Sequence, residues 1–180
     1  MKNIVIVGAA GRMGKTIIRC LQAGSIHGLK LSGAIDLWDS PDRGKDAGLA
    51  AGCNETGVKI TSDLAEVAPH CDVVIDFSGH QGTSGNAPRI ADWKKSLVIG
   101  TTGLTPEEKR VIETAAAKIP IVLAPNMSLG VNLLLSLVQK AAEALKDRGY
   151  DVEIIERHHR RKKDSPSGTA LGLGEAAAKG

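Results

Sequence analysis

The feature that most constrains the fold is a short apolar run that leads directly into a glycine-rich turn. Residues 4–7 read Ile-Val-Ile-Val, and Gly8, Gly11 and Gly14 then follow at intervals of three. In a strand–turn–helix unit, the first glycine permits the tight turn, the second lets the backbone approach a pyrophosphate, and the third allows the helix to pack closely on the strand. Free amides at the helix start would face the anion. The segment therefore predicts a dinucleotide-binding βα unit.

An acidic residue further along the chain supports this interpretation. Asp36 ends the second predicted strand, about 20 residues beyond the glycine turn, where a carboxylate accepts hydrogen bonds from the ribose hydroxyls of adenosine. The alternative is an ordinary tight turn and an ordinary loop aspartate. We favour the dinucleotide site because the glycines and the acid occur together.

The first 128 residues alternate short apolar runs with amphipathic stretches of helix length. This pattern predicts an α/β fold of the Rossmann type, a parallel sheet with helices on both faces. Strands are expected at 3–7, 29–36, 58–61, 72–77, 97–99 and 121–124, and helices at 14–22, at 62–67 and from Thr105. Thr105, Pro106 and Glu108 form a capping box with proline at the first helical position. The polar residues 37–57 are expected to form a long surface loop.

The character of the chain changes after Pro125, and we expect a domain boundary near residue 128. Residues 1–128 would bind the dinucleotide, and residues 129–180 would begin an α+β substrate domain. Apolar residues recur at helical spacing from Val131 to Leu145, which predicts a helix with one apolar face. A strand at 151–156 and a helix at 168–179 would follow. This is too little to close a core, so the second domain is expected to be incomplete.

Composition narrows the classes of function. The net charge of +3 is too small to imply a polyanionic partner, and 2% aromatic residues are few for base stacking. Three widely spaced cysteines form neither a disulfide framework nor a zinc pattern, so we expect a reducing compartment and no metal site. No apolar run approaches the roughly 20 residues of a membrane span, and the N-terminus enters a strand without a signal peptide. We expect a soluble cytoplasmic protein that binds neither membrane nor nucleic acid.

The most unusual stretch is a basic loop, residues 156–170. It contains the adjacent His158 and His159, several cations, a proline turn and a Ser-Gly-Thr helix start. The cations and the backbone amides of Gly168 and Thr169 could hold a small dianion, and a histidine can transfer a proton near neutral pH. The alternative is a solvated basic loop that contacts nucleic acid. Composition alone leaves both interpretations open.

Four motifs, in their order and spacing, resemble those of the dihydrodipicolinate reductases. They are G-A-A-G-R-M-G at 8–14, G-T-T-G at 100–103, A-P-N-M-S-L-G-V-N at 124–132, and H-H-R-R-K-K-D-S-P-S-G-T-A at 158–170. The last motif is close to diagnostic and argues against nucleic acid. The resemblance covers the whole chain. It implies reduction of the cyclic imine dicarboxylate 4-hydroxy-tetrahydrodipicolinate to tetrahydrodipicolinate, in the diaminopimelate route to lysine, and a homotetramer for the full-length proteins.

The resemblance also implies roles for individual residues. His158 would donate or accept the catalytic proton and Lys162 would be the second proton donor, whereas His159, Gly168 and Thr169 would bind the substrate carboxylates. The cofactor, NADH or NADPH, would be lined by Gly8, Ala9, Ala10, Gly11, Arg12, Met13, Asp36, Gly100, Thr101, Thr102, Ala124, Pro125, Asn126 and Met127.

Cofactor choice follows from the acid at the end of the second strand. Asp36 repels a 2′-phosphate, the next residue is Leu37 rather than a cation, and Arg43 lies far along the expected loop. We therefore expect NADH to be preferred or used equally. Arg12 could partly rescue NADPH binding by reaching its phosphate from the glycine turn.

The chain departs from the family pattern in two places. Residues 79–82 read Gly-His-Gln-Gly where the family usually has a Pro-Glu turn, and we expect His80 to be a surface residue rather than a catalytic one. The family's proteins also extend well beyond residue 180, so we expect a C-terminally truncated chain with weak NADH binding, little activity and no regular tetramer. One alternative is a catalytically silent NAD-binding fragment. Another is a different Rossmann enzyme such as homoserine dehydrogenase, which lacks the double-histidine loop.

Overall fold

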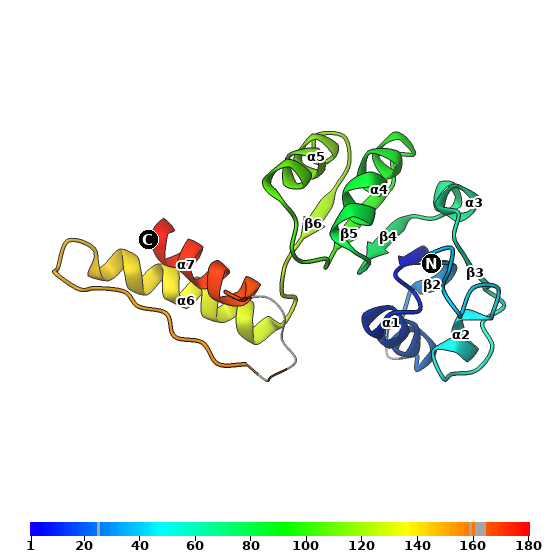
Figure 1. The fold of residues 1–180 in the computed structure, drawn as a ribbon, viewed down its shortest axis with the longest axis horizontal. Coiled ribbons are helices and arrows are strands. Elements are labelled where there is room, and N and C mark those ends of the chain that lie inside the picture. Colours follow the sequence, from blue (N-terminus) through cyan, green and yellow to red (C-terminus); the bar gives the residue numbers. More distant parts are fainter. Residues whose placement is uncertain (25, 159, 161–164) are drawn as a thin grey trace. The chain divides into compact units, whose positions relative to one another are not determined.

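The computed structural model describes residues 1–24, 26–158, 160 and 165–180. The chain divides into two compact units, Met1–Leu123 and Ala124–Gly180. The boundary that we expected near residue 128 lies a few residues beyond the one observed after Leu123. Each unit is built from its own helices (Figure 1).

The first unit contains a six-stranded parallel sheet with the order β3-β2-β1-β4-β5-β6. Its strands are β1 (Lys2–Val7), β2 (Leu29–Ile35), β3 (Ile60–Thr61), β4 (Val73–Asp76), β5 (Ser96–Ile99) and β6 (Ile121–Leu123). The predicted Rossmann-type sheet is confirmed. The chain runs outward from β1 in one direction through β2 and β3, and in the other through β4 to β6. Ligands of such sheets bind at this switch point, outside the carboxyl ends of the strands.

Two apolar cores cover the two faces of the sheet. Successive side chains of a strand point to opposite faces. In β1, accordingly, Ile4 and Ile6 pack in a core with α1 (Arg12–Gln22), while Val5 and Val7 pack in the core that contains Ile90. The second core also holds residues from α3 (Leu64–Val67), α4 (His80–Asp92) and α5 (Pro106–Ala116). Helices thus lie on both faces, as predicted (Figure 1).

The helix that follows β5 begins as the sequence predicts. Thr105 Oγ1 accepts a hydrogen bond from the amide of Glu108 at 3.2 Å, and Glu108 Oε2 accepts one from the amide of Thr105 at 2.8 Å. The capping box is therefore confirmed, and it fixes the start of α5 at the carboxyl edge of the sheet.

Residues 37–57 are more ordered than the expected surface loop. They contain a short helix, α2 (Ala47–Ala50), whose N-cap Asp46 accepts hydrogen bonds from the amides of Gly48 and Leu49 and from both the amide and the hydroxyl of Thr56. Ala47 and Ala51 are buried in the core beneath. Two small apolar residues four apart were too weak a signal to predict a helix from sequence.

Helix α4 was not predicted because its sequence opposes helix formation. It contains Gly82, Gly85 and Pro88, each of which is unfavourable inside a helix. Ala87, Ile90 and Ala91 are nevertheless buried. Burial of this face outweighs the poor local propensity.

In its described residues, the second unit contains two helices and an extended segment. Helices α6 (Leu129–Leu145) and α7 (Gly168–Lys179) confirm the two predicted helices, and they pack together where Leu135 lies beside Gly172. A second stripe of α6, formed by Leu129, Leu133 and Leu137, stays 54% to 86% exposed. The helix is therefore apolar on more than the one face predicted.

The strand predicted at residues 151–156 is wrong. These residues form no strand, and the part of the second unit that the structure describes offers no neighbouring strand to pair with them. A strand depends on hydrogen bonds to a partner, so the alternation of side chains alone could not produce one.

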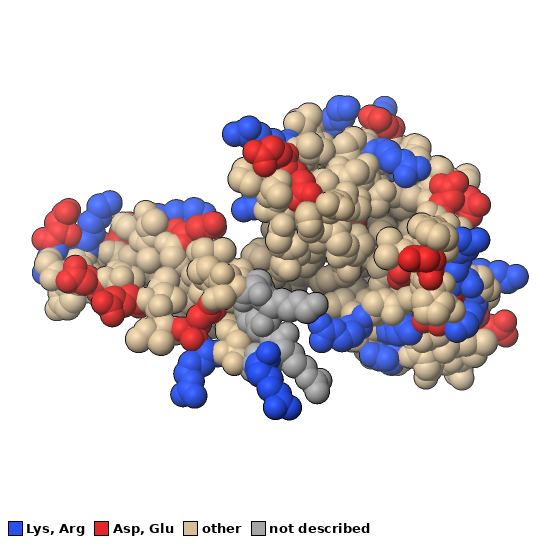
Figure 2. All heavy atoms as spheres, viewed as in Figure 1, with Lys and Arg blue, Asp and Glu red and all other residues tan. Residues whose placement is uncertain are grey.

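On the face drawn in Figure 2, acidic and basic side chains of the described residues are interspersed, in keeping with the net charge of +3. No helix in the described part of the chain is both long and apolar enough to cross a membrane.

The close packing of α1 on β1 predicts a strong difference between two glycines. A Cβ at Gly14 would lie 2.2 Å from the carbonyl oxygen of Gly8 and 2.6 Å from Ala9 Cα, whereas one at Gly85 meets nothing within 4 Å. We expect Gly14→Ala to lower the free energy of unfolding by about 3 kcal/mol through overpacking against backbone. The control Gly85→Ala should raise it by roughly 0.5–1 kcal/mol through helix propensity. Urea unfolding measures both, and equal stability of the two variants would contradict the packing described.

Candidate functional site

A groove of about 700 Å³ lies at the carboxyl ends of β1, β2 and β4, at the switch point of the sheet. The glycine turn, the end of β2 and the start of α4 form its walls. Its lining residues are Val7, Gly8, Gly11, Ile35, Asp36, Leu37, Trp38, Ser62, Leu64, Phe77, Ser78, Gly79, His80, Gln81, Gly82, Asn86 and Arg89. The groove is thus apolar along much of its length, with Asp36, His80 and Arg89 as its titratable or charged side chains.

The glycine turn leaves room and donors for an anion. Gly8 has a φ of +80°, and a Cβ there would lie 2.8 Å from the carbonyl oxygen of Phe77, so glycine is required. Gly11 is the N-cap of α1 and supplies no side-chain cap. The first amides of α1, from Arg12 and Met13 onward, are therefore available to a phosphate at this end of the groove.

Asp36 joins the end of β2 to the glycine turn. Its Oδ2 accepts a hydrogen bond from the amide of Ala10 at 2.6 Å, and its Oδ1 accepts one from the amide of Leu37 at 2.9 Å. Both bonds orient the half-buried carboxylate at the edge of the groove. Each oxygen retains a lone pair that could accept a ribose hydroxyl.

Arg43 lies closer to Asp36 than the sequence suggested. Its Nη1 donates to the carbonyl oxygen of Trp38 at 2.7 Å, so the guanidinium is held two residues beyond the acid instead of far along a loop. The same segment is anchored by Asp42, which pairs with Lys15 and Lys45 at 2.8 Å each. The hydrogen bonds from Lys15 and Lys45 lower the pKa of Asp42.

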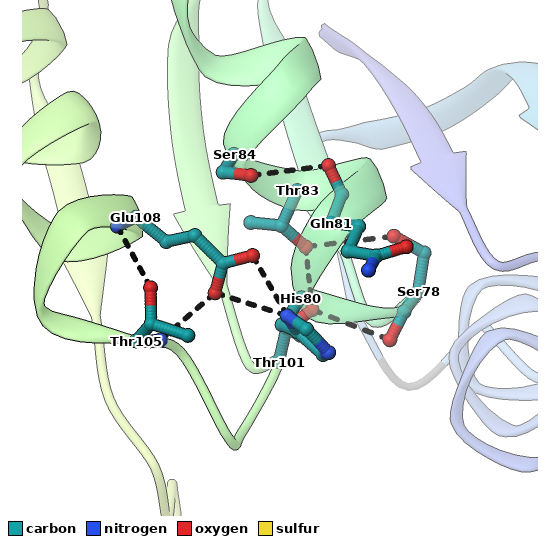
Figure 3. A network of polar contacts seen from close by, with 8 residues as sticks. All are labelled: Ser78, His80, Gln81, Thr83, Ser84, Thr101, Thr105 and Glu108. Carbon is teal, nitrogen blue, oxygen red and sulfur yellow. Dashed lines mark hydrogen bonds and ion pairs between the residues drawn. The ribbon is translucent and has the colours of Figure 1, made fainter.

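A polar network underlies the wall of the groove formed by α4 (Figure 3). Ser78 donates to Asp76 Oδ1 from its amide at 2.8 Å and from its hydroxyl at 2.6 Å. Thr83 Oγ1 donates to Thr101 Oγ1 at 2.8 Å, and both threonines are buried. Gly100, Thr101 and Thr102 were predicted to line the cofactor. The network holds Thr101 in place. A Cβ at Gly100 would lie 2.0 Å from the ring of Phe77, so that glycine is required by packing.

Residues 79–82 form the start of α4, with Gly79 as N-cap, although no helix was predicted there. His80 Nδ1 lies 2.7 Å and 3.0 Å from the two carboxylate oxygens of Glu108 on α5. The His80 side chain is 42% exposed and lines the groove. It is thus a partly exposed residue, yet one with a defined partner.

In the second unit, Glu156 links His158 to the start of α7. Its Oε1 accepts from the amide of Ser167 at 2.8 Å, and its Oε2 accepts from the Ser167 hydroxyl. His158 Nδ1 lies 3.4 Å from Oε2 of the same carboxylate. Ser167 in turn caps α7 by accepting from the amide of Ala170 at 3.0 Å. Sequence reasoning did not assign Glu156, although it directly precedes the basic run.

The remaining predicted site residues fall into two groups. Gly168 and Thr169 form the first turn of α7, and Asn126 Nδ2 donates to Thr169 Oγ1 at 3.3 Å. Residues 124–127, predicted to line the cofactor, thus belong to the second unit and contact a predicted substrate residue there. His159 and Lys162 lie outside the described residues.

Family models match both parts of the chain. The model of the dihydrodipicolinate reductase N-terminus matches residues 2–127, and that of the C-terminus matches residues 130–180. The chain belongs to the dihydrodipicolinate reductase family. This membership sets aside the homoserine dehydrogenase alternative.

Individual relatives agree with the family match. The 4-hydroxy-tetrahydrodipicolinate reductase of Anaeromyxobacter sp. (strain Fw109-5) is 51% identical over 99% of this chain and 65% of its own length. The one from Brucella abortus (strain 2308) is 51% identical, over 99% and 66%. The chain therefore spans about two thirds of the length of these curated relatives.

Solved structures also resemble the chain. A dipicolinate-bound dihydrodipicolinate reductase from Paenisporosarcina sp. TG-14 matches with a TM-score of 0.75 and 27% identity, over 99% of this chain and 66% of that one. The WlbA dehydrogenase from Bordetella pertussis, at 19% identity and a TM-score of 0.56, covers 81% of this chain and 40% of its own and supports the fold alone.

The buried Asp76 makes stability depend on pH. It is fully buried, its Oδ2 has no hydrogen-bond partner among the described residues, and burial raises its pKa. With a raised pKa, the folded state holds a proton that the unfolded state releases, so stability falls as pH rises from the unfolded pKa through the folded one. Asp76→Asn keeps the acceptor for Ser78 and cannot ionise.

We therefore expect the free energy of unfolding of Asp76→Asn, relative to that of the unaltered chain, to increase as the pH rises above about 4. Urea titrations at pH 4 to 7.5 measure the difference. The exposed Asp39→Asn is the control and should show no such trend. A difference between Asp76→Asn and the parent that does not change with pH would show that Asp76 is ionised throughout.

Proposed function

We propose that this chain supplies the cofactor-binding unit and the catalytic loop of an NAD(P)H-dependent 4-hydroxy-tetrahydrodipicolinate reductase. The reaction would reduce the cyclic imine dicarboxylate to tetrahydrodipicolinate, in the diaminopimelate route to lysine. The observation that carries the proposal is the bond between the Ala10 amide and Asp36, which brings the phosphate turn and the ribose acid together at one groove. The family of the chain supports the same conclusion.

The groove suits a nicotinamide dinucleotide. A side chain at Gly8 or Gly14 would collide with backbone. Because both residues are glycine, the turn is tight and a pyrophosphate can approach the start of α1. Asp36 would accept from the adenosine ribose. A reduced nicotinamide, when bound, supplies the hydride.

The basic loop, residues 156–170, would bind the substrate and transfer the proton. Hydride addition to a conjugated imine leaves negative charge on the ring, which a nearby acid must neutralise. The Glu156 carboxylate beside Nδ1 of His158 would orient the ring, leaving Nε2 to exchange a proton. Lys162 would be the second proton donor.

The start of α7 would bind substrate carboxylates. The amides of Gly168 and Thr169 lie in its first turn, where an anion is favoured. His159 would add a further contact. Ser167, held by Glu156, would set the direction of this turn relative to His158. The full-length protein would act as a homotetramer on a small-molecule substrate, without nucleic acid or membrane.

For cofactor choice, we expect NADH to bind as well as NADPH or better. Asp36 disfavours a 2′-phosphate, whereas Arg12 at the start of α1 and Arg43 on the Trp38 carbonyl offer partial compensation. Fluorescence titration of the chain with both cofactors tests this, and tenfold tighter NADPH binding would contradict it. Asp36→Ala should weaken NADH binding about tenfold through lost charged hydrogen bonds. Asp39→Ala, three residues away and outside the groove, is the matched control.

For catalysis, we expect His158→Ala and Lys162→Ala to lower kcat by roughly two orders of magnitude or more, because each removes a proton-transfer group. NADH affinity should hardly change. His159→Ala should act mainly on KM, because its contact would be equal in ground and transition states. The variants belong in a chain completed to the length of its relatives, with His27→Ala as control. Unchanged turnover in His158→Ala would remove that residue from the mechanism.

Two observations favour a silent NAD-binding role for the 180-residue chain taken alone. The stripe of α6 formed by Leu129, Leu133 and Leu137 is exposed, and residues 151–156 pair with no described strand. A loop without a firm support does not hold catalytic groups within the tolerance that catalysis needs. Imine-dependent NADH oxidation by this chain, measured beside the completed one, separates the two functions.

A further inference from the structure

We propose that His80 binds the pyrophosphate of the dinucleotide, with Glu108 holding its ring in place. The inference rests on the proposed cofactor site and assigns a new contact within it. His80 is the first residue of α4, and it lines the same groove as Gly8 and Gly11 of the phosphate turn. The proposed contact therefore comes from α4 and adds to those of the turn.

The bond to Glu108 fixes which edge of the ring is available. Glu108 is held by the capping box, and the Thr105 amide and His80 together lower its pKa, so its carboxylate is ionised and only accepts. The His80 Nδ1, 2.7 Å from Oε1, must therefore carry a hydrogen. The other ring nitrogen, Nε2, points away from Glu108 (Figure 3).

The charges around the groove single out this ring. A phosphate oxygen at Nε2 would place an anion on each side of the ring, and in that arrangement both ring nitrogens donate. The other cation of the lining, Arg89, is already positioned over the ring of Trp93 at 5.4 Å and lies 3.9 Å from Asp63. Asp36, the lining carboxylate, repels a phosphate. His80 thus lines the groove with one ring nitrogen bonded to Glu108 and the other left for a phosphate oxygen.

The amides of α4 add to the same site. Gly79, the N-cap, supplies no side-chain acceptor, so the first amides of this 13-residue helix remain open to a ligand, as those of α1 do. A donor at Nε2 of His80 and the helix N-terminus would contact the same kind of group, an anion. A pyrophosphate seated on the glycine turn carries that charge.

The alternative is that His80 only ties α4 to α5. Two substitutions separate these roles because they preserve different edges of the ring. In His80→Asn the side-chain amide takes the place of Nδ1 and can still donate to Glu108, but nothing reaches the groove. In His80→Gln the amide takes the place of Nε2 and can donate into the groove, but the bond to Glu108 is lost.

The test measures the affinity of the 180-residue chain for NADH, for ADP-ribose and, by competition, for adenosine. We expect His80→Asn to weaken NADH and ADP-ribose binding about tenfold, the effect of losing a charge-assisted hydrogen bond, and to leave adenosine binding within about twofold. His80→Gln should stay within about threefold of the unaltered chain for all three ligands. Thermal unfolding should show the opposite order, with His80→Asn the more stable variant.

Three results would overturn the proposal. If His80→Asn binds ADP-ribose with the same affinity as the unaltered chain, His80 serves only to connect α4 to α5. If NADH binding weakens while ADP-ribose binding does not, the contact is to the nicotinamide half instead of the pyrophosphate. If the unaltered chain binds neither NADH nor ADP-ribose, the proposed cofactor site fails, and this inference fails with it.

Discussion

The hydrogen bond from the Ala10 amide to Asp36, 2.6 Å long, joins the turn after β1 to the end of β2. The groove depends on this junction, because the glycine turn and Asp36 both line it. The proposed phosphate donors and ribose acceptor would thus be held at a fixed distance from each other. The junction depends in turn on backbone contact: Gly14 leaves space for the Gly8 carbonyl, and Gly8 leaves space for that of Phe77. Three strand ends, those of β1, β2 and β4, are thereby locked together without any large side chain.

The sequence predicted the parts of the fold that rest on local chemistry. The glycine turn, the apolar strand and the capping box are each determined by residues close together in the sequence. Accordingly, β1, α1 and α5 form where expected. Helix α4 could not be predicted, because its stability comes from burial of Ile90 and its neighbours and not from its own propensity. The strand at 151–156 fails for the complementary reason, since a strand requires a partner that local alternation does not supply.

The site shows the same division between local and long-range causes. Asp36 and the glycine turn follow from spacing along the chain. The approach of Arg43 to Trp38, the pairing of His80 with Glu108 and the link from His158 through Glu156 to Ser167 all join residues that only the folded chain brings together. The sequence therefore indicated candidate site residues more readily than the contacts that the folded chain makes between them and distant residues.

Two histidines of the chain share one arrangement and differ in their surroundings. In each, a carboxylate lies beside Nδ1 and orients the ring. Glu108 is 2.7 Å from His80, and Glu156 is 3.4 Å from His158. At His80 the carboxylate is anchored in a helix cap and the free edge faces a groove with open helix amides, which suits a stationary anion contact. At His158 the carboxylate also holds the cap of α7, so the position of the ring is coupled to the amides proposed to bind substrate. A histidine that must exchange a proton during a reaction gains more from that coupling than from a tighter bond, because its donor edge then stays aligned with the substrate.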